Sequence, residues 1–294
     1  MNISTSLNVF EIHRPIDEQI RRCKEAGFLS LDFNYWDYQG TVHNMTSKEE
    51  EAWARDIRAS ANAHGVKFTQ MHGPVHGPAF MNMVMDLNVE SFLEMARRSI
   101  RTAHTLGVPW VVFHPSNISQ RGGESLREVL RYNVEFYQKL LPVMEETGVG
   151  IALENIFDWP APGETGLFRR IYCANTEELA DLLAALDHPL FGACWDTGHG
   201  HRQGLLQAPS IRLLGPWLRT LHIQDNNGLH DQHLLPFLGT IDWDEVMSTL
   251  KEVRYGGDFT YEAHNSVRVL PDELRDSALV YAAHTANFLV GKFV

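Results

Sequence analysis

The chain has 294 residues, of which 44% are hydrophobic and 21% are charged, and its formal net charge is −12 with histidine neutral. This size and composition are typical of a water-soluble protein with a sizeable core, built as one large domain or two ordinary ones. The acidic balance disfavours a surface made mainly for nucleic acid, because phosphate binding needs clustered lysine and arginine.

Short apolar segments alternate with longer segments of helical periodicity along the chain. The short segments are rich in β-branched and aromatic residues, as buried parallel strands tend to be. They predict eight strands, at residues 3–7, 29–36, 66–73, 110–115, 149–155, 190–196, 219–225 and 258–263. Helices are predicted between them at 15–26, 47–64, 88–106, 124–147, 175–187, 242–254 and 272–289, with a short or broken helix within 205–218.

Local signals support these helix boundaries. A capping side chain precedes a glutamate by three residues at Thr46, Asn175 and Asp242. A glycine stands between a helix and the next strand at Gly27, Gly65, Gly107 and Gly148.

Strand–helix alternation repeated eight times predicts a parallel sheet with outer helices. Eight such units in 294 residues have the size of a (β/α)₈ TIM barrel, an α/β fold. We therefore predict one domain over residues 1–294, with a doubly wound open sheet as the alternative, because no linker or strong internal repeat divides the chain.

Three widely spaced cysteines, Cys23, Cys173 and Cys194, form neither a disulfide framework nor a CxxC zinc motif. The first residues, MNISTSLNVF, lack the segments of a signal peptide, and no apolar run is long enough to span a bilayer. We expect a cytoplasmic protein with no membrane partner.

Ionisable residues end the last six predicted strands. In a barrel of this kind the active site lies at the carboxyl ends of the strands. A single histidine there is more often structural than a ligand, but six consecutive strands place a metal-ligating residue type at the same rim, namely His72, His114, Glu154, Asp196, His222 and Glu262. The turn WDTGHGH adds His199, and the segment after the seventh strand adds Asp231 and His233. Such crowding predicts a bound cation or substrate that neutralises the charges.

The residue types narrow the choice of ion. Glu154, Asp196, Glu262 and His222 make an oxygen-rich ligand set. This set suits one divalent ion, with Mn²⁺ favoured and Co²⁺, Mg²⁺ and Zn²⁺ also compatible. Cys194 lies on the same side of its strand as Asp196 but deeper, and we interpret it as a packing residue.

Six motifs resemble the xylose isomerase-like TIM-barrel superfamily: MHGP (71–74), FHPS (113–116), ALEN (152–155), WDTGHGH (195–201), LHIQDNNGLHDQHLLPFLGTIDW (221–243) and YEAH (261–264). The superfamily holds sugar and sugar-phosphate isomerases and epimerases, inosose dehydratase-like enzymes and endonuclease IV-type apurinic endonucleases. Two of its branches imply different sites.

The epimerase-like branch implies one metal ion on the four ligands named above, with His72 and His199 on substrate hydroxyls. The endonuclease-like branch implies up to three Zn²⁺. The first would lie on His72, His114 and Glu154, the second on the same four ligands, and the third on His199, Asp231 and His233. The 221–243 segment is more similar to the isomerase-like members, and VHGPAFMNMVM after His72 has no lysine or arginine to grip DNA.

The resemblance implies a metal-dependent isomerase or epimerase that moves a proton next to a carbonyl through an enediolate, with Glu154 and Glu262 as base and acid. A lyase or dehydratase acting on a keto-sugar or inosose is the first alternative, and an apurinic endonuclease is the second. The expected partner is a small carbohydrate rather than nucleic acid. Which sugar, whether it is phosphorylated, and whether the protein self-associates as others in the superfamily do, stay open.

The residues that would form the walls of the substrate pocket are less clearly indicated by the sequence than the metal ligands are. Trp36 and Trp159 are candidate apolar faces for sugar C–H groups, although ordinary packing at the barrel end explains Trp36 equally well. Trp159 lies in a connection of roughly 20 residues, a length that usually marks a functional or mobile loop. Arg169 and Arg170 are candidate anion contacts or surface arginines, and Met81, Met83 and Met85 are a candidate lid or core. His201 gets no role.

Overall fold

The structure is a computed structural model that describes residues 1–75, 89–117, 124–160 and 168–293. Its central sheet has eight parallel strands in the order β10-β1-β2-β3-β4-β5-β8-β9. Each of the eight predicted strands is present: β1 Ile3–Ser6, β2 Ser30–Asn34, β3 Lys67–His72, β4 Trp110–Phe113, β5 Gly150–Glu154, β8 Phe191–Asp196, β9 Leu218–His222 and β10 Phe259–Tyr261.

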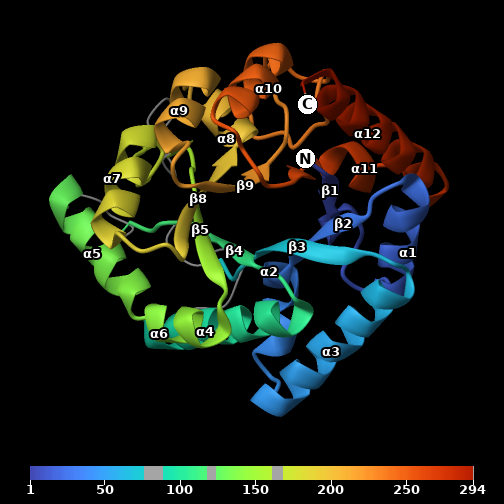
Figure 1. Cartoon of the computed structure of the whole chain (residues 1–294), viewed down its shortest axis with the longest axis horizontal. Coiled ribbons are helices and arrows are strands. Elements are labelled where there is room, and N and C mark those ends of the chain that lie inside the picture. Colours follow the sequence, from blue (N-terminus) through green and yellow to red (C-terminus); the bar gives the residue numbers. More distant parts are fainter. Residues whose placement is uncertain (76–88, 118–123, 161–167, 294) are drawn as a thin grey trace.

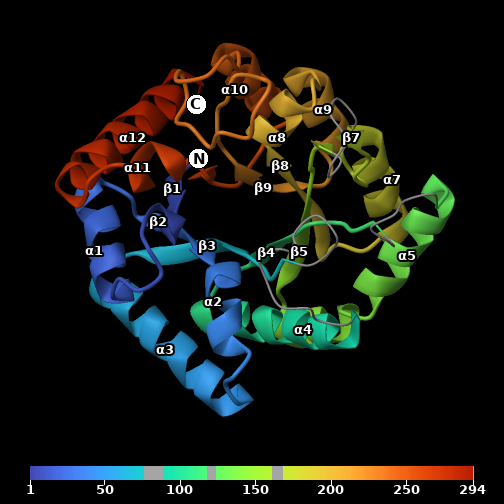
Figure 2. The same ribbon diagram turned by 180° about the vertical axis from the view of Figure 1, so that it is seen from behind.

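The sheet closes into a barrel between β9 and β10. The amide of Ile223 donates a hydrogen bond to the carbonyl of Thr260 at 2.8 Å, and the amide of Glu262 donates to the carbonyl of Ile223 at 3.0 Å. Helices surround the strands as an outer ring, seen from one end in Figure 1 and from the other in Figure 2. The prediction of a (β/α)₈ TIM barrel is confirmed, because an open doubly wound sheet would leave these two edges apart.

Most of the predicted outer helices are present, with ends within a residue or two of the prediction, except that α12 extends four residues beyond its predicted end at residue 289. They are α1 Ile16–Ala26, α3 Ser47–Ala63, α4 Val89–Leu106, α7 Thr176–Leu186, α9 Gln207–Leu214, α10 Trp243–Glu252 and α12 Asp272–Phe293. The single helix predicted at 124–147 is wrong, because the segment forms α5 Leu126–Gln138 and α6 Leu141–Thr147. Pro142 lies in the first turn of α6, where its missing amide hydrogen ends one helix and suits the start of the next.

Four short helical segments were not predicted. They are η1 Leu7–Val9, α2 Tyr35–Val42, α8 Thr197–Arg202 and α11 Asn265–Arg268. Each follows the carboxyl end of a strand, so together they surround the rim where the ionisable residues gather. Strand β2 therefore stops at Asn34, and Trp36 lies in the first turn of α2 rather than at a strand end as predicted.

The predicted caps hold at two of the three positions. Thr46 and Glu49 form a reciprocal capping box, and Asp242 accepts a hydrogen bond from the Glu245 amide. The prediction at Asn175 is wrong, because its side chain makes no cap hydrogen bond and Glu178 instead accepts from the amide of Cys173 at 3.0 Å.

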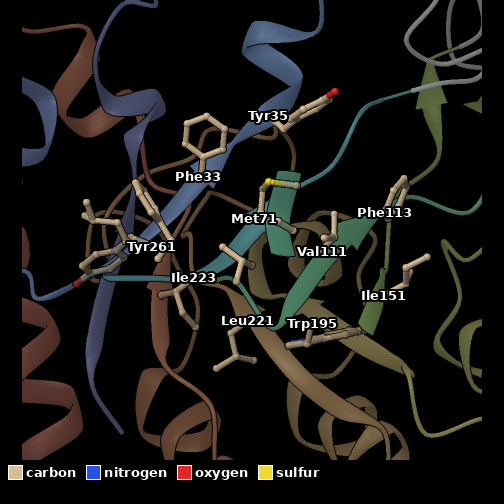
Figure 3. Packing of buried hydrophobic residues seen from close by; sticks show 14 of the residues in the cluster. Phe33, Tyr35, Met71, Val111, Phe113, Ile151, Trp195, Leu221, Ile223 and Tyr261 are labelled. Carbon is tan, nitrogen blue, oxygen red and sulfur yellow. The ribbon is translucent and has the colours of Figure 1, made fainter. Parts of the chain in front are cut away.

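The barrel is held by apolar side chains that alternate with the polar residues of the rim. Figure 3 shows Met71, Phe113, Trp195 and Leu221 packed in the buried cluster around the strands. Because successive side chains of a strand point to opposite faces, the next residue after each of them faces the barrel interior. Those next residues are His72, His114, Asp196 and His222.

The three cysteines are free and buried. Within the part of the chain that the structure describes, no helix is both long and apolar enough to cross a membrane.

Candidate metal centre

The six predicted strand-end residues lie at the same end of the barrel. Four of them are the last residues of their strands, namely His72 in β3, Glu154 in β5, Asp196 in β8 and His222 in β9. His114 and Glu262 come one residue after β4 and β10. Asp225, predicted to end the seventh strand, lies beyond it; its carboxylate accepts from Trp243 Nε1 at 2.9 Å and anchors the following loop instead.

The central group is a quartet of Glu154, Asp196, His222 and Glu262, whose ligand atoms all lie within 4.8 Å of one another. His222 Nδ1 is 2.9 Å from Glu154 Oε1 and 3.7 Å from Glu262 Oε2. Asp196 Oδ2 is buried and has no hydrogen-bond partner within the described residues. A buried, unpartnered carboxylate oxygen beside three other donors is the arrangement that a divalent cation would complete. The quartet therefore fits a metal ion.

A second group shares Glu154. Its other oxygen, Oε2, lies 2.9 Å from His114 Nε2 and 3.8 Å from His72 Nε2. His72 Nδ1 donates to the carbonyl of Gly73 at 3.0 Å, which leaves Nε2 as the nitrogen with a free electron pair. This group of three also has all its ligand atoms within 4.8 Å.

A third group consists of His199, Asp231 and His233, on α8 and on the loop after β9. Asp231 Oδ2 is 2.9 Å from His233 Nε2 and 3.8 Å from His199 Nε2. The loop is fixed by Gln224, whose amide donates to Asp231 Oδ1 at 2.8 Å. All nine of the ligand positions named from the sequence thus lie within three adjoining groups.

Burial and neighbouring charges push the pKa values of the carboxyls apart. Burial alone would raise the pKa of Glu154, but the imidazoles of His222 and His114 hold it well below its usual range. Burial raises the pKa of Glu262 to about 7, and His222 and His233 offset only part of that effect. Burial likewise raises the pKa of Asp196, against the opposing effect of His199. Glu262 and Asp196 therefore hold a proton more strongly than Glu154 does.

The histidines also differ in charge. Burial, with a smaller effect from the neighbouring His114, lowers the pKa of His72 to about 4, so His72 is neutral at pH 7. Burial opposes the charged form of His233, but its hydrogen bond to Asp231 raises its pKa to about 10. A neutral imidazole can bind a metal ion, so His72 can act as a ligand. His233 instead keeps its proton, because Asp231 stabilises its charged form.

Cys194 also falls within ligand distance of Glu154 and His222. Burial raises the pKa of its thiol to about 12, so it carries no thiolate, the form that binds metals. It packs with Val112 and Ala152 inside the barrel, in agreement with its interpretation as a packing residue.

Several supporting residues had no prediction from the sequence. Asn155 pairs with the backbone of Asp196 in both directions, at 3.0 and 2.7 Å, and its carbonyl accepts from His199 Nδ1 at 2.9 Å. Asp32, in the middle of β2, lies 3.3 Å from His222 Nε2. The available signal was a carboxylate inside the apolar strand LSLDF, since a charge is rarely buried without a partner.

A cavity of about 250 Å³ opens onto these groups. Trp36 and Trp159 both line it; the Trp36 ring lies 6.3 Å from that of His72, and Trp159 stacks on Phe157 at 5.4 Å. A larger cavity of about 480 Å³ lies at the opposite end, beside Lys67, Trp110 and Arg219, but none of the grouped ligands lines it. The grouped ligand residues, and not the size of the cavity, therefore identify the candidate site.

The remaining candidates lie elsewhere. Arg170 forms an ion pair with Glu178, which accounts for its charge without an anion. His201 is 2.8 Å from Thr240 Oγ1 and belongs to none of the groups. Met81, Met83, Met85 and the side chain of Arg169 lie outside the described residues.

Comparison with known proteins gives a family and a set of similar folds. The model of a family described as xylose isomerase-like TIM barrel matches residues 20–283. An uncharacterised protein of Methanocaldococcus jannaschii is 29% identical over 200 residues, which is 66% of this chain and 64% of that protein, just under two thirds of its length.

Two solved structures illustrate the similarity of fold. A D-psicose 3-epimerase from Clostridium cellulolyticum H10, solved with D-tagatose, has a TM-score of 0.75 at 15% identity and covers 99% of both chains. The IolI protein with a bound zinc atom has a TM-score of 0.70 at 17% identity and covers 100% of this chain and 99% of that one.

Proposed function

The chain belongs to the xylose isomerase-like TIM barrel family, and from this premise we propose that it is a divalent-metal-dependent sugar isomerase or epimerase. The observation that carries the proposal is the buried quartet of three carboxylates and one imidazole at the mouth of the barrel. The structurally similar D-psicose 3-epimerase supports this class of reaction, and the zinc atom bound in the IolI structure supports a metal ion at the site.

The residues that would hold the ion are Glu154, Asp196, His222 and Glu262. Mn²⁺ suits this oxygen-rich set, and Co²⁺, Mg²⁺ or Zn²⁺ are compatible with it. When bound, the ion supplies an electrophile that stabilises negative charge developing on the substrate's oxygens.

The reaction itself is assigned to the protein's carboxyls. Removal of a proton next to a carbonyl gives an enediolate, which is reprotonated at the other face or at the neighbouring carbon. We assign the two proton transfers to Glu154 and Glu262, from β5 and just after β10. In the metal-free protein their pKa values are shifted in opposite directions, as is typical of an acid and a base that work as a pair. We assign to His72 and His199 the binding of substrate hydroxyl groups.

The charge of the cavity favours a sugar without phosphate. None of the described residues that line it is lysine or arginine. Because phosphate recognition relies on arginine and lysine, an uncharged keto-sugar is the better fit. Trp36 and Trp159 would offer it apolar faces.

Two alternative activities are compatible with the same group of residues. A lyase or dehydratase on a keto-sugar or inosose would start from the same proton removal and then expel a neighbouring oxygen. An apurinic endonuclease of the endonuclease IV type is favoured by one feature, namely that the two further groups of three lie beside the quartet and extend its capacity to three Zn²⁺. The net charge of −12 disfavours a nucleic-acid partner.

The location proposed is the cytoplasm, where three buried free thiols stay reduced. We also propose that copies of the chain associate into a homo-oligomer. Light scattering of the purified protein measures its oligomeric state.

The test combines metal analysis with isotope exchange. Protein loaded with Mn²⁺ is incubated in deuterated water with a panel of unphosphorylated ketoses, their phosphates and inososes. We expect about one divalent ion per chain and deuterium at the carbon next to the carbonyl, with the unphosphorylated ketoses preferred. Elimination products would favour the lyase. Three zinc ions with cleavage of abasic DNA, and no exchange in any sugar, would overturn the proposal.

A further inference from the structure

Both ring nitrogens of His222 face carboxylates. Nδ1 points to the quartet, 2.9 Å from Glu154 Oε1. Nε2 points the other way, into the barrel, and lies 3.3 Å from Asp32 Oδ2. The imidazole is fully buried, so water does not replace either partner.

Asp32 is itself a buried charge with few partners. It is 1% exposed, two residues before the end of β2, and therefore lies below the rim. Its Oδ2 accepts a second hydrogen bond, from Gln70 Nε2 at 3.1 Å, and the same amide nitrogen donates to the carbonyl of Leu221 at 3.3 Å. Its Oδ1 has no hydrogen-bond partner in the described part of the chain. A carboxylate placed so deeply is costly unless partners compensate its charge, and among the described residues the ion-pair partner of Asp32 is His222.

Each ring nitrogen of His222 faces a carboxylate that accepts a proton, Glu154 at Nδ1 and Asp32 at Nε2, so a cation in the quartet would decide which proton is kept. A neutral imidazole carries one proton, on Nδ1 or on Nε2. A carboxylate beside Nε2 is an acceptor, so it favours the form with hydrogen on Nε2 and repels the form with an electron pair there. A cation held by Glu154, Asp196 and Glu262 would displace the proton on Nδ1, and the form with hydrogen on Nε2 would then direct the electron pair of Nδ1 at the ion. Such a carboxylate behind a ligating histidine fixes the ring and strengthens it as a ligand.

We propose that Asp32, supported by Gln70, is the positioning residue that holds His222 as an Nδ1 ligand for the metal of the quartet. The inference rests on the proposed metal dependence and adds a residue that does not touch the ion or the substrate. It acts through the ring orientation and the proton on Nε2.

The first test measures metal affinity rather than turnover. Mn²⁺ is titrated into metal-free protein and the free ion is followed by electron paramagnetic resonance. Loss of the charge in Asp32→Asn should weaken Mn²⁺ binding by about 10- to 100-fold. Thr260→Val is the matched control, because Thr260 is also buried in the barrel wall and its hydroxyl has no partner among the described residues. Its affinity should stay within about twofold of the unsubstituted protein.

A second test measures the unsubstituted chain and does not depend on the folding of Asp32→Asn. Protein labelled with ¹⁵N-histidine is loaded with diamagnetic Zn²⁺, and the His222 signals are identified by their loss in His222→Gln. We expect a proton on Nε2 and a metal-shifted Nδ1. A metal-shifted Nε2, or a proton on Nδ1, would overturn the inference even where Asp32→Asn does not fold.

The outcomes separate the two claims. If the unsubstituted protein binds Mn²⁺ and Asp32→Asn binds it equally well, the role of Asp32 is refuted while the proposed function stands. If the unsubstituted protein binds no divalent ion, the metal-dependent function fails and the inference fails with it.

Discussion

Glu154 and His222 are joined by a 2.9 Å hydrogen bond although 68 positions separate them in the chain. They end β5 and β9, two strands that do not pair, because β8 lies between them in the sheet. The contact therefore passes over the carboxyl end of β8. It brings a carboxylate with a lowered pKa against an imidazole in a dry environment, where both are available to an ion or a substrate.

Removing the charge of either proposed proton-transfer residue should abolish turnover. In Glu154→Gln and Glu262→Gln the amide has the shape of the carboxyl but neither takes up a proton nor binds the ion as well. We expect kcat to fall by about 10²- to 10⁴-fold, with an unchanged circular dichroism spectrum. Glu177→Gln, exposed in the first turn of α7, is the control and should be fully active. Substantial activity in one of the first two variants would remove that residue from the mechanism.

Trp36 provides a test of the cavity wall. If the indole covers the sugar, Trp36→Ala should raise KM by about 2- to 10-fold and leave kcat within a few-fold, since stacking of this kind contributes about 0.5–1.5 kcal/mol. Trp36→Phe should restore most of the affinity. The contrary result is a lowered melting temperature with an unchanged KM, which would make Trp36 a packing residue.

Gly198 lies where a methyl group does not fit. A Cβ there would lie 2.2 Å from Cδ of Gln224, the residue that holds Asp231 and accepts from the His233 amide at 3.2 Å. Gly198→Ala should therefore lower the free energy of unfolding by about 1–3 kcal/mol. Gly291→Ala, in α12 with no atom within 4 Å of the added carbon, should instead be neutral or stabilising by up to about 1 kcal/mol. Urea unfolding measures both, and equal stability of the two variants would contradict the steric argument.

The two ends of the chain are linked by an ion pair with a distinct pH dependence. Both oxygens of Glu11 meet the guanidinium of Arg275, each at 2.6 Å, and the hydrogen bond from Arg275 lowers the pKa of Glu11 to about 2. Because the folded pKa is below the unfolded value, the pair stabilises the protein fully above about pH 4.5. That stability is lost as the pH falls towards about 2.

Glu11→Gln should thus destabilise the protein by about 1–2 kcal/mol at pH 7, after allowance for solvent screening, and by progressively less below pH 4.5. The exposed pair of Arg21 and Glu25 supplies the control, and Glu25→Gln should change stability too little to resolve. A difference between Glu11→Gln and the unsubstituted protein that is constant from pH 7 to pH 3 would refute the assignment.

The errors of the sequence-based prediction have local causes. The short helices after β1, β2, β8 and β10 are three to eight residues long, too short for a 3.6-residue period to be visible. The sequence predicts a strand through Trp36 because Phe33, Tyr35 and Trp36 are aromatic, a residue type that favours strands, whereas the structure has Tyr35 and Trp36 in helix α2. Asn175 has the spacing of a cap, but Glu178 is committed to Arg170 and to the amide of Cys173.

The sequence by itself determined where the eight strands lie and which of their residues face the interior. That information is local, because side chains alternate with a period of two and apolar residues such as Met71 and Trp195 settle which face is buried. Only the tertiary structure decided which of those side chains contact one another. Closure of the barrel beside β9 brings Asp32 to His222 across 190 positions, and it separates Asp225 and His201 from the quartet. A single sequence does not encode such distances in any local pattern, because they depend on how eight strands meet around a ring.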